Sequence, residues 1–179
     1  LTAKIPEGIE RIGDDVFNSC KAMTSIIIPQ SLKSIGRSAF EYCVSLGSIT
    51  LPAGVTSIGP KAFEGCFLLK TFVAQMPDPD RVMLGDDVFR HVPKDNTKNT
   101  FCQLYVPEGS KQKYEAAAQW KDFAPNILEG LPLGIRPLEN EHPMRKSGIY
   151  RLDGVRCQGS LQQLPAGIYI VNGKKVAKK

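Results

Sequence analysis

Residues 25–47 read SIIIPQSLKSIGRSAFEYCVSLG, and residues 48–70 read SITLPAGVTSIGPKAFEGCFLLK. These two stretches are copies of one 23-residue unit, and residues 2–24 contain a third copy. Residues of the same type recur at this period in several columns: Pro6, Pro29 and Pro52; Ile12, Ile35 and Ile58; Gly13, Gly36 and Gly59; Phe17, Phe40 and Phe63; Cys20, Cys43 and Cys66. A fixed period of this length is typical of chains built from stacked repeats. We therefore predict a solenoid.

Each unit predicts the same series of elements. The run Ser25–Pro29 alternates apolar side chains and ends in a proline, which predicts a short strand. The segment Ser34–Gly36 predicts a second brief strand after a turn. In Arg37–Cys43, the residues Ala39, Phe40 and Cys43 have helical spacing, so we expect a short helix there. One or two helical turns are not stable alone, and stacking on the next unit would stabilise them.

The period is interrupted twice after residue 73. Gly13-Asp14-Asp15-Val16-Phe17 recurs as Gly85-Asp86-Asp87-Val88-Phe89, three residues later than three periods require. This offset predicts an insertion near Met76–Asp80, and the spacing from Gly85 to Pro107 predicts another near Lys94–Thr100. The run Ser110–Phe123 predicts a longer helix, with Ser110 as its N-cap, that covers the end of the stack.

The repeated pattern Ile-Pro-x-x-(Leu/Val)-x-x-Ile-Gly-x-x-Ala-Phe-x-x-Cys resembles the BspA-type leucine-rich repeat of bacterial surface proteins. The resemblance covers about residues 1–129, and residues 104–123 are similar to the segment that often ends such arrays. The fold class implied is an α/β leucine-rich-repeat solenoid of strand, turn and short helix, with a helical cap. Because residues 3–8 already align with a repeat strand, we expect the array to begin before residue 1.

The remaining chain predicts two further segments. Residues 130–147 are rich in Pro, Gly and charge and predict a linker. Residues 148–179 contain Asp153-Gly154 and Asn172-Gly173 between apolar runs, which predicts a small β-hairpin segment. This segment is similar to the end of sorting domains that some bacteria use for export to the surface, although it is shorter. An accessory hairpin packed on the cap is the alternative.

No constellation of catalytic residues is present in the sequence, so we do not predict an enzyme or a cofactor. His91 and His142 lack Cys, Asp or Glu partners at metal-ligand spacing, and we expect both to be solvated loop residues. An acidic stretch with Asp78, Asp80, Asp86 and Asp87 could hold calcium, but a turn followed by a helix N-terminus explains it better. We predict no metal site.

The cysteine column is expected to hold free thiols. Stacked strands lie roughly 4.8 Å apart, and side chains in one column point in the same direction, which is unsuitable for disulfides. Cys20, Cys43 and Cys66 are therefore predicted to act as small apolar side chains. Bridges or a metal column remain the alternatives, and Cys102 and Cys157 are not assigned.

Charge argues against binding to nucleic acid. The net charge of +5 comes from residues 131–179, which carry +6, while residues 1–73 carry +1 and residues 74–130 carry −2. A nucleic-acid binder is expected to show a basic face on its folded platform. No apolar run is long enough to predict a membrane span.

Binding is predicted on the outer face of the stacked strands. If Ile26 and Ile28 face the core, then Ile27 faces outward with its equivalents in the other turns. This predicted ligand-binding column is Lys4, Ile27, Thr50, Val73 and Tyr105. The alternative explanation is that β-branched residues simply favour strands.

The family resemblance implies a non-catalytic recognition or adhesion module, secreted or at the cell surface, that binds a protein partner such as a host or matrix protein. A structural spacer or stalk without a ligand is the second hypothesis. The exposed sheet separates the two: a contiguous apolar and aromatic patch favours recognition, and a uniformly polar sheet favours a spacer.

Overall fold

The computed structural model describes residues 1–94 and 101–130, together with strand residues 149–151, 156–157, 167–171 and 174–178. The chain divides into two compact units, Leu1–Ile135 and Arg136–Lys179. The predicted linker, residues 130–147, lies outside the described residues except for Gly130, and His142, Asp153-Gly154 and Asn172-Gly173 also lie outside them.

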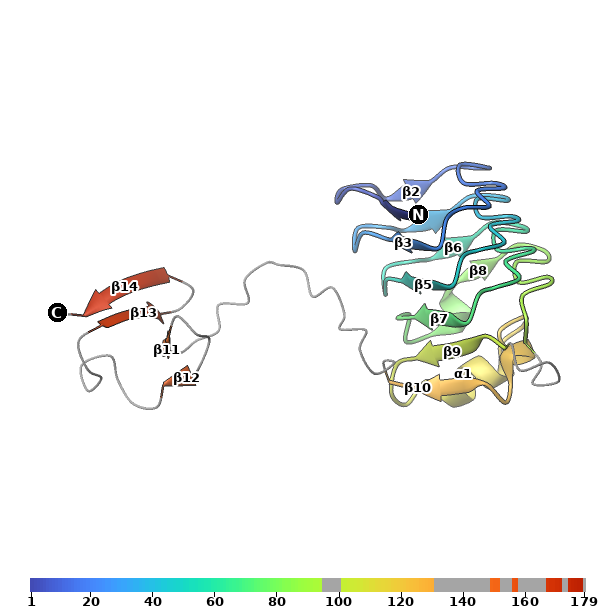
Figure 1. The fold of residues 1–179 in the computed structure, drawn as a ribbon. Helices are drawn as coiled ribbons and strands as arrows, with labels where there is room; N and C mark the ends of the chain where they lie inside the picture. The colour runs from blue at the N-terminus through green and yellow to red at the C-terminus, as the bar shows by residue number, and fades with distance from the viewer. Residues whose placement is uncertain (95–100, 131–148, 152–155, 158–166, 172–173, 179) are drawn as a thin grey trace. The chain divides into compact units, whose positions relative to one another are not determined.

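The first unit is a parallel β-solenoid of about five turns, with a six-stranded sheet along one side (Figure 1). Equivalent residues of successive units pair directly, for example Thr2 with Ser25 and Ser48 with Thr71. The strand order follows the chain, because each unit adds one strand to the growing edge. The strands are β1 (Thr2–Lys4), β3 (Ser25–Ile27), β5 (Ser48–Leu51), β7 (Thr71–Ala74), β9 (Gln103–Val106) and β10 (Ile127–Glu129).

A second parallel sheet confirms the predicted brief strand of each unit. It contains β2 (Arg11–Ile12), β4 (Ser34–Ile35), β6 (Ser57–Ile58) and β8 (Met83–Leu84). The isoleucines of β2, β4 and β6 are buried, and Leu84 takes this position in β8, where it is half-buried. The glycine after it lets adjacent turns approach: a Cβ on Gly59 would lie 2.6 Å from the backbone nitrogen of Arg37.

The predicted short helix of each unit is wrong: the segment is a series of turns. Ser38 and Tyr42 have φ values of 51° and 54°, and the equivalent residues of the other units also have positive φ. Left-handed residues four positions apart interrupt a right-handed helix. N–H groups along this segment instead donate to the next unit, as the Phe40 N–H does to the Ala62 carbonyl at 2.8 Å. We call this third side of the solenoid the turn face.

The core is a column of phenylalanine rings between the sheets and the turn face. Phe17, Phe40 and Phe63 stack at centroid distances of 5.3 and 5.2 Å, with planes inclined by 8° and 3°. Phe89 continues the stack at 6.1 Å from Phe63. The ladder ends on the rings of Trp120 and Phe123, which pack against Phe89.

The cysteines beside this column are free thiols. Cys43 and Cys66 are fully buried, as predicted, whereas Cys20 in the first unit is half-buried. The Cys43 thiol donates to the Phe17 carbonyl at 3.0 Å, so each thiol links two units. Burial raises the pKa of Cys43 to about 11 and of the buried, free Cys102 to about 12.

The end of the solenoid differs from the predicted long helix. A 3-10 turn, η1 (Pro79–Arg81), lies at the first predicted insertion. Only Lys111–Ala116 form an α-helix, α1, and a 3-10 turn, η3 (Lys121–Phe123), follows. The Ser110 hydroxyl bonds to the Pro107 carbonyl rather than capping the helix. Strand β10, which was not predicted, then extends the six-stranded sheet beside β9.

In the second unit, the strands form an antiparallel sheet in the order β12-β11-β13-β14. These strands are β11 (Ile149–Arg151), β12 (Arg156–Cys157), β13 (Gly167–Val171) and β14 (Lys174–Lys178). Strand β13 pairs with β14 along its full length, from Gly167–Lys178 to Val171–Lys174.

Candidate functional site

The predicted sheet column is brought together by the strand register. Lys4 pairs with Ile27, and Val73 lies between Thr50 and Tyr105. Ile26 and Ile28 are each 6% exposed, so the alternation that places their neighbour on the outer face is present. Leu128 in β10 extends the column and was not predicted, because β10 itself was not.

Exposure along this column is lower than expected. Lys4 is exposed, and Ile27, Thr50 and Tyr105 are half-buried. Val73 keeps its place in the column by register but is only 1% exposed, so it offers no accessible surface to a ligand. Small polar residues flank the column, and Thr2 and Ser25 bond to each other through their hydroxyls at 2.8 Å. This sheet therefore offers little contiguous apolar area.

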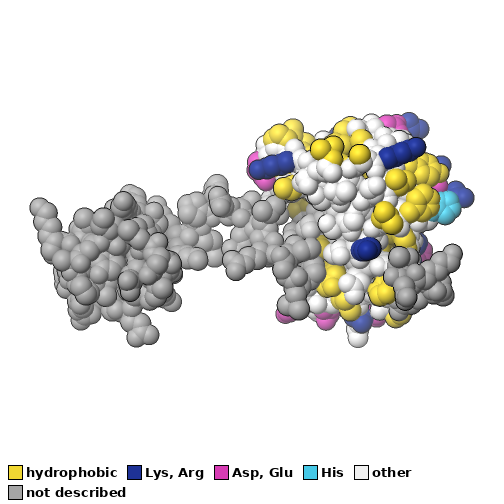
Figure 2. Space-filling view, viewed as in Figure 1, with side chains coloured by type: hydrophobic (Ala, Val, Ile, Leu, Met, Phe, Trp, Pro, Cys, Tyr) yellow, Lys and Arg dark blue, Asp and Glu magenta, His cyan; other side chains and the backbone are white. Residues whose placement is uncertain are grey.

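The turn face carries a more pronounced apolar patch. Tyr42, Phe67 and Leu68 are 39%, 45% and 51% exposed. The rings of Tyr42 and Phe67 lie 6.4 Å apart, and Phe67 lies 6.3 Å from the ring of His91. Figure 2 shows hydrophobic side chains gathered beside His91 on this edge of the solenoid. We call Tyr42, Phe67, Leu68 and His91 the aromatic patch.

Gly65 makes room for this patch. It occupies the repeat position of Tyr42 and has a φ of +71°. A Cβ at Gly65 would lie 2.5 Å from the Tyr42 ring. The tyrosine ring therefore lies over a glycine of the next unit, where any other residue would displace it.

A buried carboxylate lies beneath the aromatic patch. The side chain of Glu64 is 4% exposed, and its oxygens lie 3.5 Å from Lys61 Nζ, 3.7 Å from His91 Nδ1 and 3.9 Å from Arg90 Nη1. Its Oε2 has no hydrogen-bond partner among the described residues. His91 thus has an acidic neighbour that its sequence spacing does not indicate, because Glu64 belongs to the preceding turn, while the imidazole itself is exposed, as expected of a solvated residue.

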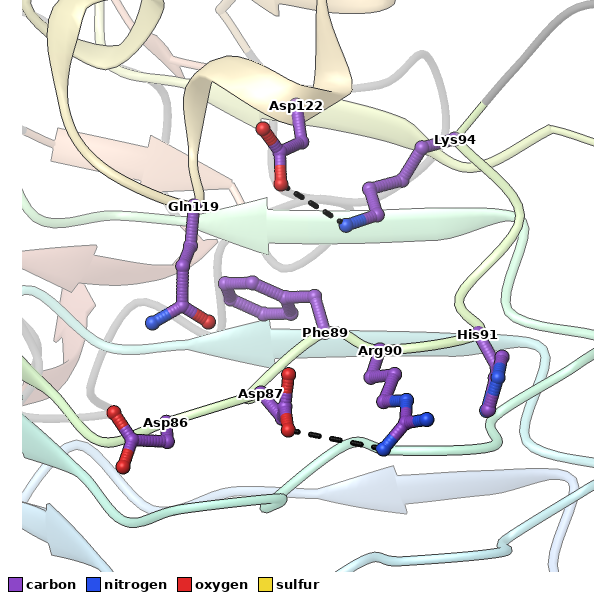
Figure 3. A pocket seen from close by; sticks show the side chains of 8 residues that line it. All are labelled: Asp86, Asp87, Phe89, Arg90, His91, Lys94, Gln119 and Asp122. Carbon is purple, nitrogen blue, oxygen red and sulfur yellow. Dashed lines mark hydrogen bonds and ion pairs between the residues drawn. The ribbon is translucent and has the colours of Figure 1, made fainter.

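A cleft of about 620 Å³ opens between the last turn of the repeat and the end segment (Figure 3). The lower rim carries an Asp87–Arg90 ion pair at 3.8 Å, and the upper rim carries a Lys94–Asp122 ion pair at 3.4 Å. Phe89 lies between the two rims. The remaining lining residues are Asp86, His91 and Gln119.

The acidic stretch does not converge on one point. Asp78 pairs with Arg81 and with Lys113, each at 3.6 Å. Asp86 and Asp87 belong to a turn, so the predicted helix N-terminus there is wrong. Within the described residues, no group of three His, Cys, Asp or Glu side chains is arranged to hold a metal.

A repeat of 23 residues, two parallel sheets and a stacked phenylalanine core define a leucine-rich-repeat solenoid. Residues 2–93 match the family described as "BspA type Leucine rich repeat region (6 copies)". The chain belongs to this family, whose members are typically non-catalytic and commonly serve as protein-interaction or surface modules.

A comparison with curated proteins gives no match. Among solved structures, the chain is similar to the crystal structure of a leucine-rich repeat protein from Bacteroides ovatus ATCC 8483, with 26% identity and a TM-score of 0.48. The similarity covers 72% of this chain and 30% of that protein, so the chain spans less than a third of its length. None of the described helices has the length and apolarity needed to cross a bilayer.

Proposed function

We propose that this chain is a non-catalytic recognition module, secreted or at the cell surface, that binds a protein partner such as a host or matrix protein. The observation that supports the proposal is the aromatic patch on the turn face. Aromatic residues are enriched where proteins bind one another, and a few such side chains often supply most of the binding free energy. Contiguous exposed apolar area on a soluble domain is otherwise uncommon.

The aromatic patch is a better contact surface than the predicted sheet column. Tyr42 and Phe67 present two rings held over a rigid backbone, so little conformational entropy is lost when a partner covers them. On the sheet column, Val73 is buried and Ile27 and Tyr105 are half-buried. We propose that the column supplies secondary contacts.

The alternative is a spacer that displays another part of a longer protein and has no ligand of its own. A spacer has no need of exposed rings that lie side by side on adjacent turns. The polar flanks of the sheet, such as Thr2 and Ser25, favour the spacer for that face alone.

The test is adherence of the purified chain to intact epithelial cells and to extracellular matrix. A Tyr42→Ser, Phe67→Ser double variant should bind at least tenfold more weakly. Each ring contributes about 1–2 kcal/mol of binding free energy at a well-packed contact. Val16→Ser is the matched control, because Val16 is 54% exposed in the first unit and lies outside the patch. An Ile27→Ser, Tyr105→Ser variant measures the contribution of the sheet column to adherence. Full adherence by the first double variant would remove the aromatic patch as the site, and no adherence by the parent chain would favour the spacer.

A further inference from the structure

Successive turns on the turn face are joined by a regular hydrogen-bond ladder. The N–H groups of Asp15, Phe17 and Ser19 donate to the carbonyls of Arg37, Ala39 and Glu41 at 2.7–2.9 Å. The next two junctions repeat the arrangement: Ser38, Phe40 and Tyr42 donate to Pro60, Ala62 and Glu64, and Lys61, Phe63 and Gly65 donate to Asp86, Val88 and Arg90. Every other residue of a turn therefore donates to the turn that follows.

The fourth turn has the same donors, but the described part of the chain supplies no acceptors for them. Its corresponding N–H groups belong to Asp87, Phe89 and His91. Within residues 1–94 and 101–130, none of these groups has a hydrogen-bond acceptor. The cleft of about 620 Å³ borders all three residues, at the point where another unit would continue the turn face (Figure 3).

The end segment of the solenoid closes one end of this cleft. Gln119 accepts from Val88 N–H at 2.9 Å and donates to the Gly85 carbonyl at 2.7 Å. In the preceding unit, the equivalent Ala62 N–H and Gly59 carbonyl bond directly at 3.3 Å. Gln119 therefore occupies the Gly85 end, while the stretch from Asp86 to His91 still borders the cleft.

The first turn shows which kind of segment packs against this motif, because Gly13–Phe17 and Gly85–Phe89 are identical in sequence. In the first turn, Asp14 Oδ1 accepts the N–H of Arg37 at 2.9 Å, and Asp15 Oδ2 lies 3.7 Å from the Arg37 guanidinium. A segment of the next unit, which follows the same series of turns and carries a basic residue, thus lies along the motif. In the fourth turn Asp87 pairs with Arg90, and Asp86 has no ion-pair partner among the described residues.

We infer that the cleft binds a peptide segment of a protein partner in the turn conformation of residues 37–41. The segment accepts hydrogen bonds from Asp87, Phe89 and His91 and places a basic side chain against Asp86. Peptides are commonly recognised through main-chain hydrogen bonds to an open edge, as in strand addition to a sheet, and here the open edge belongs to the ladder of the turn face. The ligand side chain over Phe89 must be small or point outward, because Trp120 and Phe123 already pack on that ring at 4.8 and 5.1 Å. The inference rests on the proposed function only in taking the partner to be a protein.

The probe is the hexapeptide Gly-Arg-Ser-Ala-Ser-Glu, which copies residues 36–41 with Phe40→Ser. It is titrated into the ¹⁵N-labelled chain, and amide resonances are followed by NMR. We expect saturable downfield shifts of the Asp87, Phe89 and His91 amide protons. The same peptide carrying Arg37→Glu should bind at least tenfold more weakly, because it loses the charge-assisted contact and adds a like charge. Asp86→Asn in the chain should weaken binding several-fold, and Asp14→Asn, at the occupied copy of the motif, should leave it unchanged.

Three outcomes would overturn the inference. The three amides do not shift, or both peptides bind equally, or binding appears only after residues 95–100 are replaced by glycine and serine, which would identify the chain's own segment as the occupant. The Tyr42→Ser, Phe67→Ser variant separates this inference from the proposed function. If that variant binds the peptide but has lost adherence, both hold; if adherence survives while the peptide binds, only the aromatic patch is rejected.

Discussion

The ring of Phe40 stacks face to face on the ring of Phe63, with centroids 5.2 Å apart and planes inclined by 3°. Both rings are fully buried, and Phe17 stacks on the other face of Phe40. Each ring therefore joins two turns of the solenoid, and a repeat protein is stabilised chiefly by such contacts between neighbours.

Replacing Phe40 with alanine should lower the free energy of unfolding by about 3–5 kcal/mol, because the cavity opens between two turns. Phe17→Ala is the matched control. Phe17 is half-buried and stacks on one neighbouring phenylalanine of the column, so its loss should cost less than half as much. Urea unfolding followed by circular dichroism measures both. Equal losses would show that the column does not transmit stability along the stack.

The glycines of the repeat differ in what they allow. A Cβ on Gly59 would lie 2.6 Å from backbone atoms of Gly36 and Arg37, whereas a Cβ on Gly47 would lie 3.7 Å from the nearest atom, the Thr24 carbonyl oxygen. Gly59→Ala should therefore cost about 1–3 kcal/mol through overpacking. Gly47→Ala should stay within about 1 kcal/mol of the parent. Thermal unfolding of the two variants distinguishes them, and a tolerated Gly59→Ala would contradict the close approach of adjacent turns.

The parts of the fold that the sequence predicts are those that recur. The 23-residue period places Ile35 and Ile58 in paired strands, and Phe40 and Cys43 in the core. The helix was predicted wrongly because Ala39, Phe40 and Cys43 are buried at spacings that suit a helix and a double turn equally. Backbone φ decides between them, and serine and tyrosine, unlike glycine, do not indicate a positive φ at positions 38 and 42. Strand β10 follows β9 by one 23-residue period, since Ile127 pairs with Leu104, but the counterpart of Pro107 is Gly130, so the strand-proline pattern did not reveal it.

Burial makes the core thiols resist ionisation, which raises the pKa of Cys43 to about 11. An unfolded thiol ionises near pH 8.5, so between about pH 8.5 and 11 the unfolded chain binds fewer protons than the folded one. Stability from this group is fully present below about pH 8.5 and is lost as pH rises, at about 1.4 kcal/mol per pH unit. The thermal unfolding midpoint should decrease as the pH is raised from 8 to 10.5, and this decrease should be smaller in Cys43→Ala. An unchanged pH profile in Cys43→Ala would contradict a buried neutral thiol.

The aromatic patch depends on Gly65. Gly65→Ala places a Cβ 2.5 Å from the Tyr42 ring at a φ of +71°, so the ring must move and the backbone is strained. We expect adherence of this variant to fall towards that of Tyr42→Ser, with Tyr42 fluorescence more accessible to a soluble quencher. Gly109→Ala is the control, since its φ is +76° and no atom lies within 4 Å of the added Cβ. A loss of adherence in both variants would attribute the effect to backbone strain rather than to the ring.

The candidate site could be predicted only in part. Alternation along a strand correctly puts Ile27 and Tyr105 on one face, since side chains of a strand alternate strictly. The aromatic patch joins Tyr42, Phe67 and His91 from three turns through backbone geometry that the pattern did not reveal. The cleft arises where the repeat stops, so it belongs to no repeated position. A useful sign was present in the sequence: Gly13–Phe17 recurs as Gly85–Phe89 without a following unit of the same kind.

Gln119 closes one end of the cleft, and its removal tests how far the end segment substitutes for a further unit on the turn face. Gln119→Ala loses the bonds to Val88 N–H and to the Gly85 carbonyl, which should cost about 1–3 kcal/mol in unfolding free energy. Because Gln119 has a φ of 62°, Gln119→Gly is the better-matched comparison: it loses the same bonds and relieves the backbone. Both variants should accelerate hydrogen exchange at the Val88 amide, while exchange at Ala62 in the preceding turn stays unchanged. If Val88 exchange does not respond in either variant, the side chain of Gln119 does not close the turn. The cleft would then extend to Gly85, and a longer peptide than the hexapeptide would be its best ligand.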